Sequence, residues 1–248
     1  MIAPADRIGL VTGAGSGIGR ATALEFAHTG AKVAVLDINA EAAAATASAI
    51  ANAGGSAIAV QVDIGDDGSV KAAVENVVTT YGRLDFAVNN AGVPSFHRQL
   101  DEMTVDESAR VVHVNLVGTF LCLKYELAVL SDAGAIVNVA SSGGLHSMPN
   151  APAYVASKHG IVGLTKAAAR DYASRQIRVN SLCPGATQTP FFESIATGTS
   201  MAANAAAATP LGRVAQPEEV AAAAVWLCSP AASYLTGIAL PLDGGRWQ

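Results

Sequence analysis

Cysteine is rare in this sequence, and its placement excludes two classes of protein. The 248 residues include three cysteines, at positions 122, 183 and 228, each alone within an apolar segment. They offer neither a disulfide framework nor the ligand spacing of a metal site. We expect three buried thiols in a reducing cytoplasm, because free cysteine usually packs as a small hydrophobe.

Positive charge and long apolar runs are also scarce. The 15 basic residues are outnumbered by 20 acidic ones, the formal net charge is −5, and the basic residues form no cluster. Binding of nucleic acid or anionic lipid requires such a cluster, so we expect neither partner. No uncharged apolar run reaches the roughly 18 residues that span a bilayer. Residues 1–13 lack the basic and apolar regions of an export signal. A soluble, cytoplasmic protein is therefore expected.

Short apolar runs alternate regularly with longer amphipathic stretches along the whole sequence. Continuous apolar runs indicate strands covered on both faces, and strands alternating with helices indicate a parallel sheet with right-handed crossovers. We predict one α/β domain over 1–248, with a doubly wound parallel sheet flanked by helices. Its seven strands are predicted at 8–12, 32–37, 56–62, 84–89, 135–140, 177–183 and 237–242.

One long region contains no clear strand. It covers residues 190–213, between the last two predicted strands. Loops of that length in compact domains are usually functional lids or disordered segments. We predict a substrate lid there.

The stretch "LVTGAGSGIGRA" at 10–21 follows the first predicted strand and opens a helix near Gly17. The spacing departs from G-x-G-x-x-G because Ile18 stands in place of the third glycine, and it fits G-x-x-x-G-x-G instead. Backbone N–H groups at such a helix start bind pyrophosphate, and glycines let it approach; a merely flexible turn is the alternative. The predicted contacts are Gly13, Gly15, Ser16, Gly17, Ile18 and Gly19.

An acidic residue ends the second predicted strand. Asp37 lies about 20 residues beyond the glycines, where an acid accepts hydrogen bonds from the adenosine ribose hydroxyls. A 2′-phosphate there would face like charge, and no Arg or Lys follows in "DINAE" to neutralise it. We predict NAD rather than NADP as the cofactor. Capping of the next helix is the alternative role for Asp37.

Tyr154 and Lys158 form an i, i+4 pair near the start of a helix predicted from Pro152. A tyrosine acting as a general base near neutrality needs its pKa lowered from ~10 to roughly 7. A lysine ammonium about 4 Å away, at an effective dielectric of about 20, provides roughly that amount. We predict Tyr154 as the general acid/base. Ser141, at the carboxyl edge of the strand 135–140, would hold the substrate oxygen, with Ser142 as the alternative.

Together these motifs resemble the short-chain dehydrogenase/reductase family over nearly the whole chain. The matching pieces are "TGAGSGIG" at 12–19, Asp37, Asp63, "NNAG" at 89–92, Asn115, Ser141, "YVASK" at 154–158 and "PGATQT" at 184–189. The resemblance implies a Rossmann fold and an NAD-dependent oxidoreductase that interconverts a secondary alcohol and its ketone. It implies that Ser141 orients the substrate while Tyr154 moves its proton. It also implies that Lys158 binds the nicotinamide ribose and that Asn115 holds a water in a proton relay.

The resemblance also implies where the cofactor lies and how subunits assemble. Asp63 and Ile64 would flank the adenine, and Thr189 would hold the nicotinamide end. A homotetramer is implied, with helices 102–131 and 152–174 at one interface and the tail, bearing an exposed Trp247, at another. The implied cofactor contacts beyond the glycine turn and Asp37 are Ile38, Asp63, Ile64, Asn89, Ala91, Gly92, Tyr154, Lys158, Pro184, Gly185, Thr187 and Thr189.

The segments that the resemblance assigns to the substrate are largely apolar. No basic cluster in 190–213 would hold a phosphate, coenzyme A or a carrier arm. We expect a small or mid-sized apolar secondary alcohol, with cyclic alcohols among the candidates. The rivals are a 3-oxoacyl thioester reductase and a non-catalytic dinucleotide-binding sensor or scaffold. No metal site is expected. The implied substrate contacts are Ser141, Val93, Phe96, Leu145, His146, Met148, Phe191, Phe192 and Met201.

Overall fold

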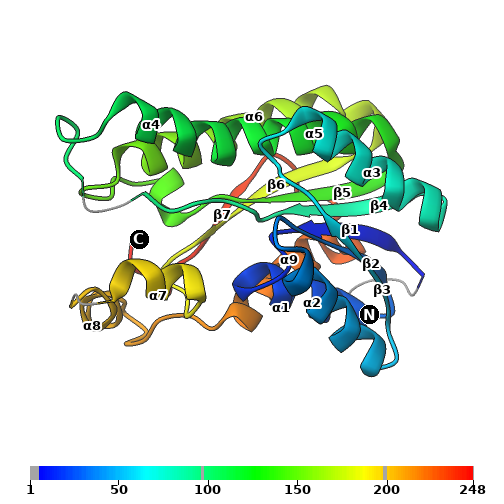
Figure 1. Ribbon diagram of the computed structural model, residues 1–248, viewed down its shortest axis with the longest axis horizontal. Helices are drawn as coiled ribbons and strands as arrows, with labels where there is room; N and C mark the ends of the chain where they lie inside the picture. The colour runs from blue at the N-terminus through cyan, green and yellow to red at the C-terminus, as the bar shows by residue number, and fades with distance from the viewer. Residues whose placement is uncertain (1–5, 96–97, 198–199, 248) are drawn as a thin grey trace.

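The computed structural model describes residues 6–95, 98–197 and 200–247, and its centre is one parallel sheet (Figure 1). The strand order is β3-β2-β1-β4-β5-β6-β7, which confirms the predicted doubly wound fold. The chain order reverses between β1 and β4, so a crevice opens at their carboxyl ends, where ligands bind in open α/β sheets. The strands are β1 (Ile8–Thr12), β2 (Lys32–Asp37), β3 (Ser56–Gln61), β4 (Leu84–Asn89), β5 (Leu130–Val139), β6 (Arg178–Pro184) and β7 (Ala239–Leu242).

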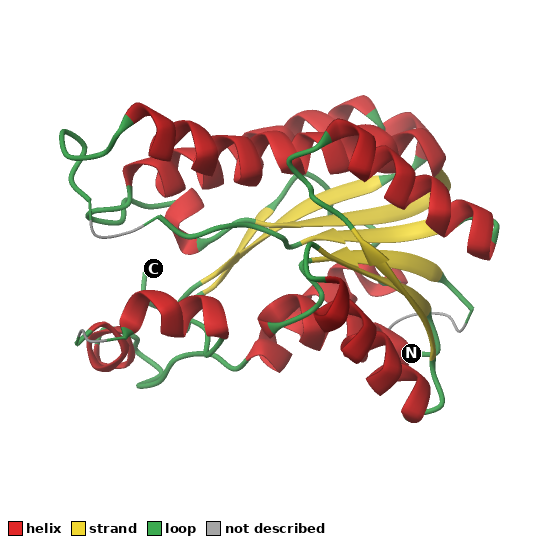
Figure 2. Ribbon diagram, in the orientation of Figure 1, coloured by secondary structure: helices red, strands yellow, loops and turns green. Residues whose placement is uncertain are grey.

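Helices cover both faces of the sheet (Figure 2). One layer holds α3 (Asp67–Tyr81), α4 (Val105–Val112), α5 (Gly118–Val129) and α6 (Pro152–Asp171). The other holds α1 (Gly17–His28), α2 (Ala40–Asn52) and α9 (Pro217–Cys228). The π-helical turn η1 (His113–Val117) joins α4 to α5, and short 3₁₀ turns lie at η2 (Ser142–Gly144), η3 (Ala173–Arg175) and η4 (Pro230–Ala232).

The strand-free region 190–213 contains helices that the sequence analysis did not predict. They are α7 (Pro190–Ala196) and α8 (Met201–Ala207), which lie beside the carboxyl end of the sheet (Figure 1). Pro190 is suited to a first helical turn, and Thr189 caps α7 by accepting a hydrogen bond from the Phe192 backbone N–H at 3.1 Å. The segment is therefore a folded flap.

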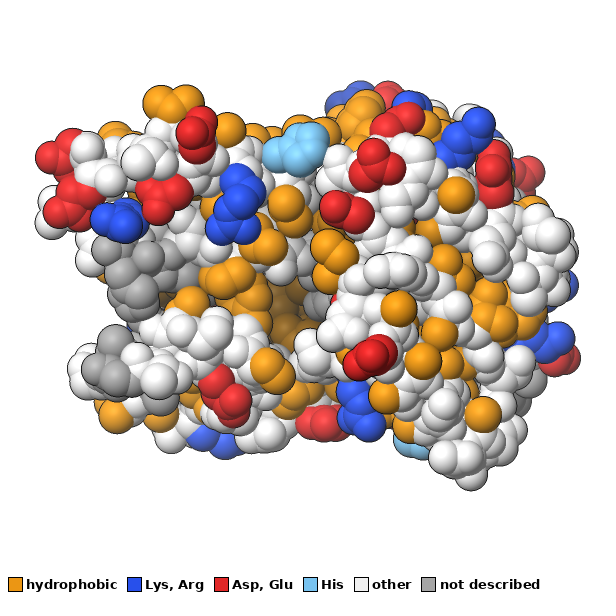
Figure 3. Space-filling model, in the orientation of Figure 1, with side chains coloured by type: hydrophobic (Ala, Val, Ile, Leu, Met, Phe, Trp, Pro, Cys, Tyr) orange, Lys and Arg blue, Asp and Glu red, His pale blue; other side chains and the backbone are white. Residues whose placement is uncertain are grey.

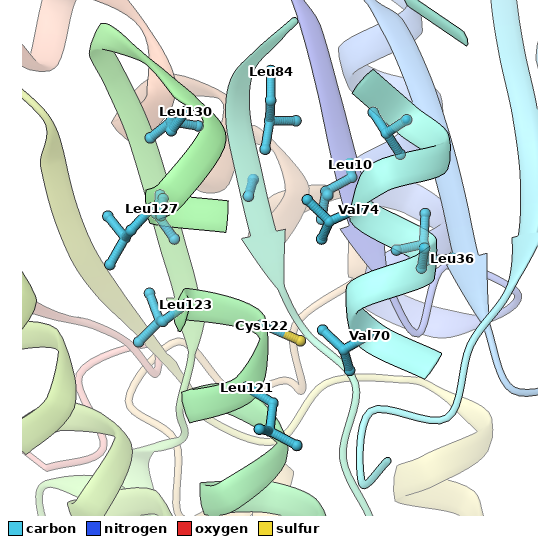
Figure 4. Packing of buried hydrophobic residues seen from close by; sticks show 14 of the residues in the cluster. Leu10, Leu36, Val70, Val74, Leu84, Leu121, Cys122, Leu123, Leu127 and Leu130 are labelled. Atoms are coloured by element: carbon cyan, nitrogen blue, oxygen red, sulfur yellow. The ribbon is translucent and has the colours of Figure 1, made fainter. Parts of the chain in front are cut away.

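Each face of the sheet has its own apolar core. On the α3/α5 side, leucines and valines from strands and helices interlock around Leu10, Leu84 and Leu127 (Figure 4). On the α1/α9 side, Phe26 stacks on Phe86 with ring centroids 4.0 Å apart. Burial on both faces explains the continuous apolar strands. The free cysteines at 122, 183 and 228 are all buried, as predicted.

The continuous helix Val105–Val129 is long and apolar enough to cross a membrane by length and composition. Half of its most apolar window is nevertheless buried within the fold. Leu121, Leu123 and Leu127 belong to the core between this helix and the sheet. That is the pattern of a core helix.

Candidate active site

A cavity of about 930 Å³ lies at the carboxyl edge of the sheet, where the order of the strands reverses. It appears in Figure 3 as a hollow lined largely by hydrophobic side chains, between the two helix layers. The cavity brings together most of the predicted site residues. They are Gly13, Ser16, Gly17, Ile18, Asp37, Ile38, Asp63, Ile64, Ala91, Gly92, Val93, Ser141, Met148, Tyr154, Lys158, Pro184, Gly185, Thr187, Thr189, Phe191 and Phe192.

The glycine turn between β1 and α1 forms one wall of the cavity. Gly13 and Gly17 have φ of +63° and +51°, a region that favours glycine. A Cβ on Gly19 would lie 2.1 Å from the Gly13 carbonyl oxygen, so Gly19 permits close packing of the helix against the turn. Ser16 is the N-cap of α1 but makes no side-chain capping hydrogen bond. The N-terminal N–H groups of α1 thus have no cap from this side chain.

Asp37 stands at the end of β2 with its carboxylate fixed. Oδ2 accepts a hydrogen bond from the Gly15 backbone N–H at 2.8 Å, and Oδ1 accepts one from the Asn39 N–H at 2.9 Å. Gly15 itself does not line the cavity; it positions Asp37. Asn39, not Asp37, caps α2, by accepting from the Ala42 N–H. The alternative reading of Asp37 as the cap is therefore wrong.

The two asparagines of "NNAG" point in different directions. The Asn89 side chain does not line the cavity as predicted: it is buried and donates to Glu126 Oε2 at 2.9 Å and Asn138 Oδ1 at 3.0 Å. It faces the core because residues alternate sides at the strand end. Asn90 lines the cavity instead, and its Nδ2 donates to the Thr12 carbonyl at 3.1 Å. Asn90 therefore ties the end of β4 to that of β1.

Ser141 and Tyr154 meet on the opposite wall of the cavity. Ser141 follows β5, and its Oγ accepts a hydrogen bond from the Gly143 N–H at 3.1 Å. Tyr154 lies in the first turn of α6, which Pro152 begins. Its side chain is hydrogen-bonded to Ser141, which lowers the Tyr154 pKa, but burial outweighs this and raises that pKa to about 12. Ser142 also lines the cavity.

Lys158 lies one helical turn beyond Tyr154 and is buried. Its ammonium donates to the Val139 carbonyl at 3.0 Å and lies 5.6 Å from the centre of the tyrosine ring. Burial lowers the Lys158 pKa to about 8. The expectation that this ammonium, about 4 Å away, brings the tyrosine pKa close to 7 is not met in the protein alone, because the cost of burying the phenolate is larger.

Asn115 occupies the π-helical turn and is fully buried. Oδ1 accepts from the Val93 N–H at 2.7 Å, and Nδ2 donates to the Val93 carbonyl at 3.1 Å and to Ser157 Oγ at 3.2 Å. The side chain does not line the cavity. It holds the segment after β4 against α6, and its role in a proton relay stays a prediction.

The part of the cavity beside Tyr154, where the sequence analysis expects the substrate, has apolar walls. Val93, Met148 and Phe191 pack around Tyr154, and the rings of Phe191 and Tyr154 have centroids 6.1 Å apart. Leu145 does not reach this pocket, because its side chain packs in the core with Ile161 and other residues under η2. Phe96 and the side chain of Met201, both predicted to face substrate, lie outside the described residues.

His146 and Trp247 form a contact that the sequence analysis missed. Their rings stack with centroids 5.3 Å apart and an interplanar angle of 15°. Trp247 lines the cavity, whereas His146 does not. The prediction of an exposed Trp247 is therefore wrong: the tail turns back over the cavity.

Comparison with known proteins identifies the family. A family model described as "Enoyl-(Acyl carrier protein) reductase" matches residues 13–246. The 2,5-dichloro-2,5-cyclohexadiene-1,4-diol dehydrogenase of Sphingobium indicum is 42% identical over 95% of both chains. The cyclohexanol dehydrogenase of Acinetobacter sp. is 42% identical over 96% of this chain and 94% of its own. The crystal structure of a levodione reductase has a TM-score of 0.93 at 34% identity, over 98% of both chains. The chain belongs to the short-chain dehydrogenase/reductase family.

Short-chain dehydrogenases are oxidoreductases that use a nicotinamide dinucleotide, NAD(H) or NADP(H). The residues of this dehydrogenase fit such a group. The α1 N-terminus, uncapped by Ser16, is suited to a pyrophosphate. A Cβ on Gly17 would lie 3.2 Å from Thr189, so the glycine keeps the passage beneath the flap open. Asp37 and Lys158 line the same continuous cavity.

Besides Asn90, the cavity residues of the dehydrogenase that were not predicted include Arg110, Arg246 and Trp247. In the sequence, Arg110 cannot be distinguished from the solvent-exposed charges of an amphipathic helix. Arg246 and Trp247 follow the last strand, where the local sequence pattern does not indicate which way the tail runs. The signal that could have found them is the pair Gly244–Gly245, whose positive φ values of 63° and 87° bend the chain back.

Proposed function

We propose that this dehydrogenase interconverts a small or mid-sized cyclic secondary alcohol and its ketone, with NAD as cofactor. The observation that carries the proposal is the hydrogen-bonded pair Ser141–Tyr154 beside buried Lys158, in the wall of a cavity that also holds the glycine turn and Asp37. A non-catalytic dinucleotide sensor would not require this constellation.

In the proposed mechanism Ser141 orients the substrate hydroxyl and Tyr154 removes its proton. When bound, the oxidised nicotinamide supplies the hydride acceptor. Lys158 holds positive charge near the phenol and would bind the nicotinamide ribose of the cofactor. Asn115 fixes Val93 at the substrate end and is the proposed start of a proton relay to solvent. Tyr154 returns the proton in the reductive direction.

The preference for NAD rests on Asp37. Its two oxygens are held in place by the Gly15 and Asn39 N–H groups, with lone pairs left for ribose hydroxyls. A 2′-phosphate about 4 Å from this carboxylate would be opposed by roughly 4 kcal/mol at an effective dielectric of about 20. The lysine and arginine residues that line the cavity are Arg110, Lys158 and Arg246, and none of them adjoins Asp37 in the sequence.

The substrate class is supported by the pocket and by the relatives. Val93, Met148 and Phe191 give the reacting end an apolar wall. Two relatives are named for six-membered carbocyclic alcohols. We also propose that 190–213 acts as a lid, because Phe191 and Phe192 of α7 line the cavity.

Assembly as a homotetramer remains a proposal. Val117, Phe120 and Val129 are exposed along the helix 105–129, at 37%, 49% and 38%. An exposed apolar face of this kind favours pairing with a second copy. Light scattering of the purified protein tests it.

The function is tested with cyclohexanol by following the formation of NADH from NAD, or of NADPH from NADP, at 340 nm. We expect turnover with NAD and a kcat/KM at least 100-fold lower with NADP. Tyr154→Phe should reduce kcat at least 1000-fold while NAD still binds, because the base is lost and the cavity is kept. Preferred turnover of a 3-oxoacyl thioester with NADPH, or NAD binding without oxidation of any secondary alcohol, would overturn the proposal.

A further inference from the structure

The C-terminal tail brings a guanidinium to a cavity that is lined largely by apolar side chains. The charged residues that line the cavity are Asp37, Asp63, Arg110, Lys158 and Arg246. Asp37 ends β2 and Asp63 follows β3, at the adenosine end by the proposed binding mode. Lys158 is engaged with the Val139 carbonyl. Arg246 forms no salt bridge with any residue in the described part of the chain.

The tail that carries Arg246 is held in a defined turn. After β7, the Asp243 carboxylate accepts hydrogen bonds from the Gly245 N–H at 3.0 Å and from the Trp247 N–H at 3.2 Å. Gly244 and Gly245 adopt positive φ, which lets the chain reverse. Figure 1 shows the chain end between the α4/α6 layer and α7. Arg246 is therefore directed to the cavity by a built turn rather than by a loose end.

A chain of ring contacts links this turn to the reacting end. The Arg246 guanidinium lies 5.5 Å from the centre of the Trp247 ring, and Trp247 stacks on His146. His146 is in the segment that leads from Ser141 to Met148, and Met148 packs in the cluster that contains Tyr154. The tail thus lies beside the substrate segment, away from Asp37 on the second strand.

We infer that Arg246 is an anion subsite for the substrate and that the physiological substrate is a cyclic secondary alcohol, or its ketone, that carries a carboxylate. An unpaired guanidinium in a partly enclosed, apolar cavity binds carboxylate strongly, because its fork of N–H donors matches the two oxygens. The Trp247 ring beneath it limits its rotation and adds a flat apolar surface for the ring of the substrate. This inference rests on the proposed function.

The test compares two substrates that differ by one carboxylate. Cyclohexanol and cis- or trans-4-hydroxycyclohexanecarboxylate are assayed with NAD, using wild type, Arg246→Gln, Arg246→Lys and the control Lys71→Gln. Lys71 is an exposed residue of α3 outside the cavity, and its change alters net charge equally. We expect wild type to prefer a carboxylated isomer. Arg246→Gln should lower kcat/KM for that isomer at least about tenfold, mainly through KM, which is the loss typical of a charge-assisted hydrogen bond.

The remaining arms separate the ways in which the inference can fail. Arg246→Gln should lower kcat/KM on cyclohexanol far less than on the carboxylated isomer, because cyclohexanol has no carboxylate to lose a contact. Arg246→Lys should keep part of the preference for the carboxylated isomer, and the control Lys71→Gln should keep all of it. Equal losses on both substrates, a raised KM for NAD, or no preference in wild type would overturn the anion subsite. If wild type oxidises neither alcohol, the proposed function itself fails, which is a separate result.

Discussion

Replacement of Glu126 by glutamine should make the protein more stable at and above neutral pH. Glu126 is fully buried on α5; its Oε2 accepts from Asn89, while Oε1 and the Asn89 Oδ1 have no hydrogen-bond partner. Burial raises the Glu126 pKa from 4.5 to about 7. The carboxyl is therefore protonated in the folded protein over a pH range in which the unfolded chain has released that proton.

The sign and size of the effect follow from linkage. A raised folded-state pKa gives stability that is present below pH 4.5 and is lost as pH rises to about 7. The shift corresponds to about 3 kcal/mol at roughly 1.4 kcal/mol for each pH unit. A glutamine side chain at this position has no charge to bury, and its amide can still accept from Asn89 while donating to the unpartnered Asn89 oxygen.

Urea unfolding from pH 4.5 to pH 8 measures the difference. Wild type and Glu126→Gln should have similar free energies of unfolding near pH 4.5, and the variant should be more stable by about 3 kcal/mol at pH 8. The control Glu75→Gln removes an exposed carboxylate on α3 and should retain the wild-type slope. Parallel pH profiles for wild type and Glu126→Gln would refute the reasoning, because Glu126 would then have the same pKa in the folded and the unfolded protein.

Four further substitutions test the cofactor and substrate contacts. Asp37→Ser should lower kcat/KM for NAD at least tenfold and raise it for NADP, since the like charge facing a 2′-phosphate is removed; steady-state kinetics with both cofactors decide it. Gly19→Ala places a Cβ within 2.1 Å of the Gly13 carbonyl oxygen and should cost about 1–3 kcal/mol in thermal unfolding as well as NAD affinity; an unchanged Tm would contradict the close packing. Ser141→Ala should reduce kcat at least 100-fold and Ser142→Ala far less; the reverse order would assign the substrate contact to Ser142.

Strand positions were predictable because burial on both faces leaves continuous apolar runs. The largest differences lie at the ends: β5 begins at Leu130 rather than 135 and β7 at Ala239 rather than 237, and the other ends differ by at most one residue. The segment at Leu130 was missed because "SDAG" interrupts the apolar run; there the register between β4 and β5 shifts. Polar residues within a strand do not show from the sequence that its pairing with the neighbouring strand is irregular.

The candidate site was predictable where a residue type is tied to a local backbone feature. The glycine turn and the Tyr154–Lys158 pair are of this kind, since both are fixed by the start of a helix. Side-chain direction at strand ends and tails was not: Asn89 faces Glu126, Leu145 faces the core, and Trp247 folds over the cavity. Those directions depend on partners far away in the sequence, which no local pattern contains.

The activation of Tyr154 also exceeds what the i, i+4 spacing can provide. With a pKa of about 12, ionising this tyrosine at pH 7 costs about 7 kcal/mol. The Lys158 ammonium, 5.6 Å from the centre of the ring, offsets part of this cost by its positive charge. We expect the remainder to come from further positive charge in the same cavity, which a bound oxidised nicotinamide would supply. We therefore expect Tyr154 to stay protonated at neutral pH until the cofactor binds, because burial raises its pKa and Lys158 offsets only part of that cost.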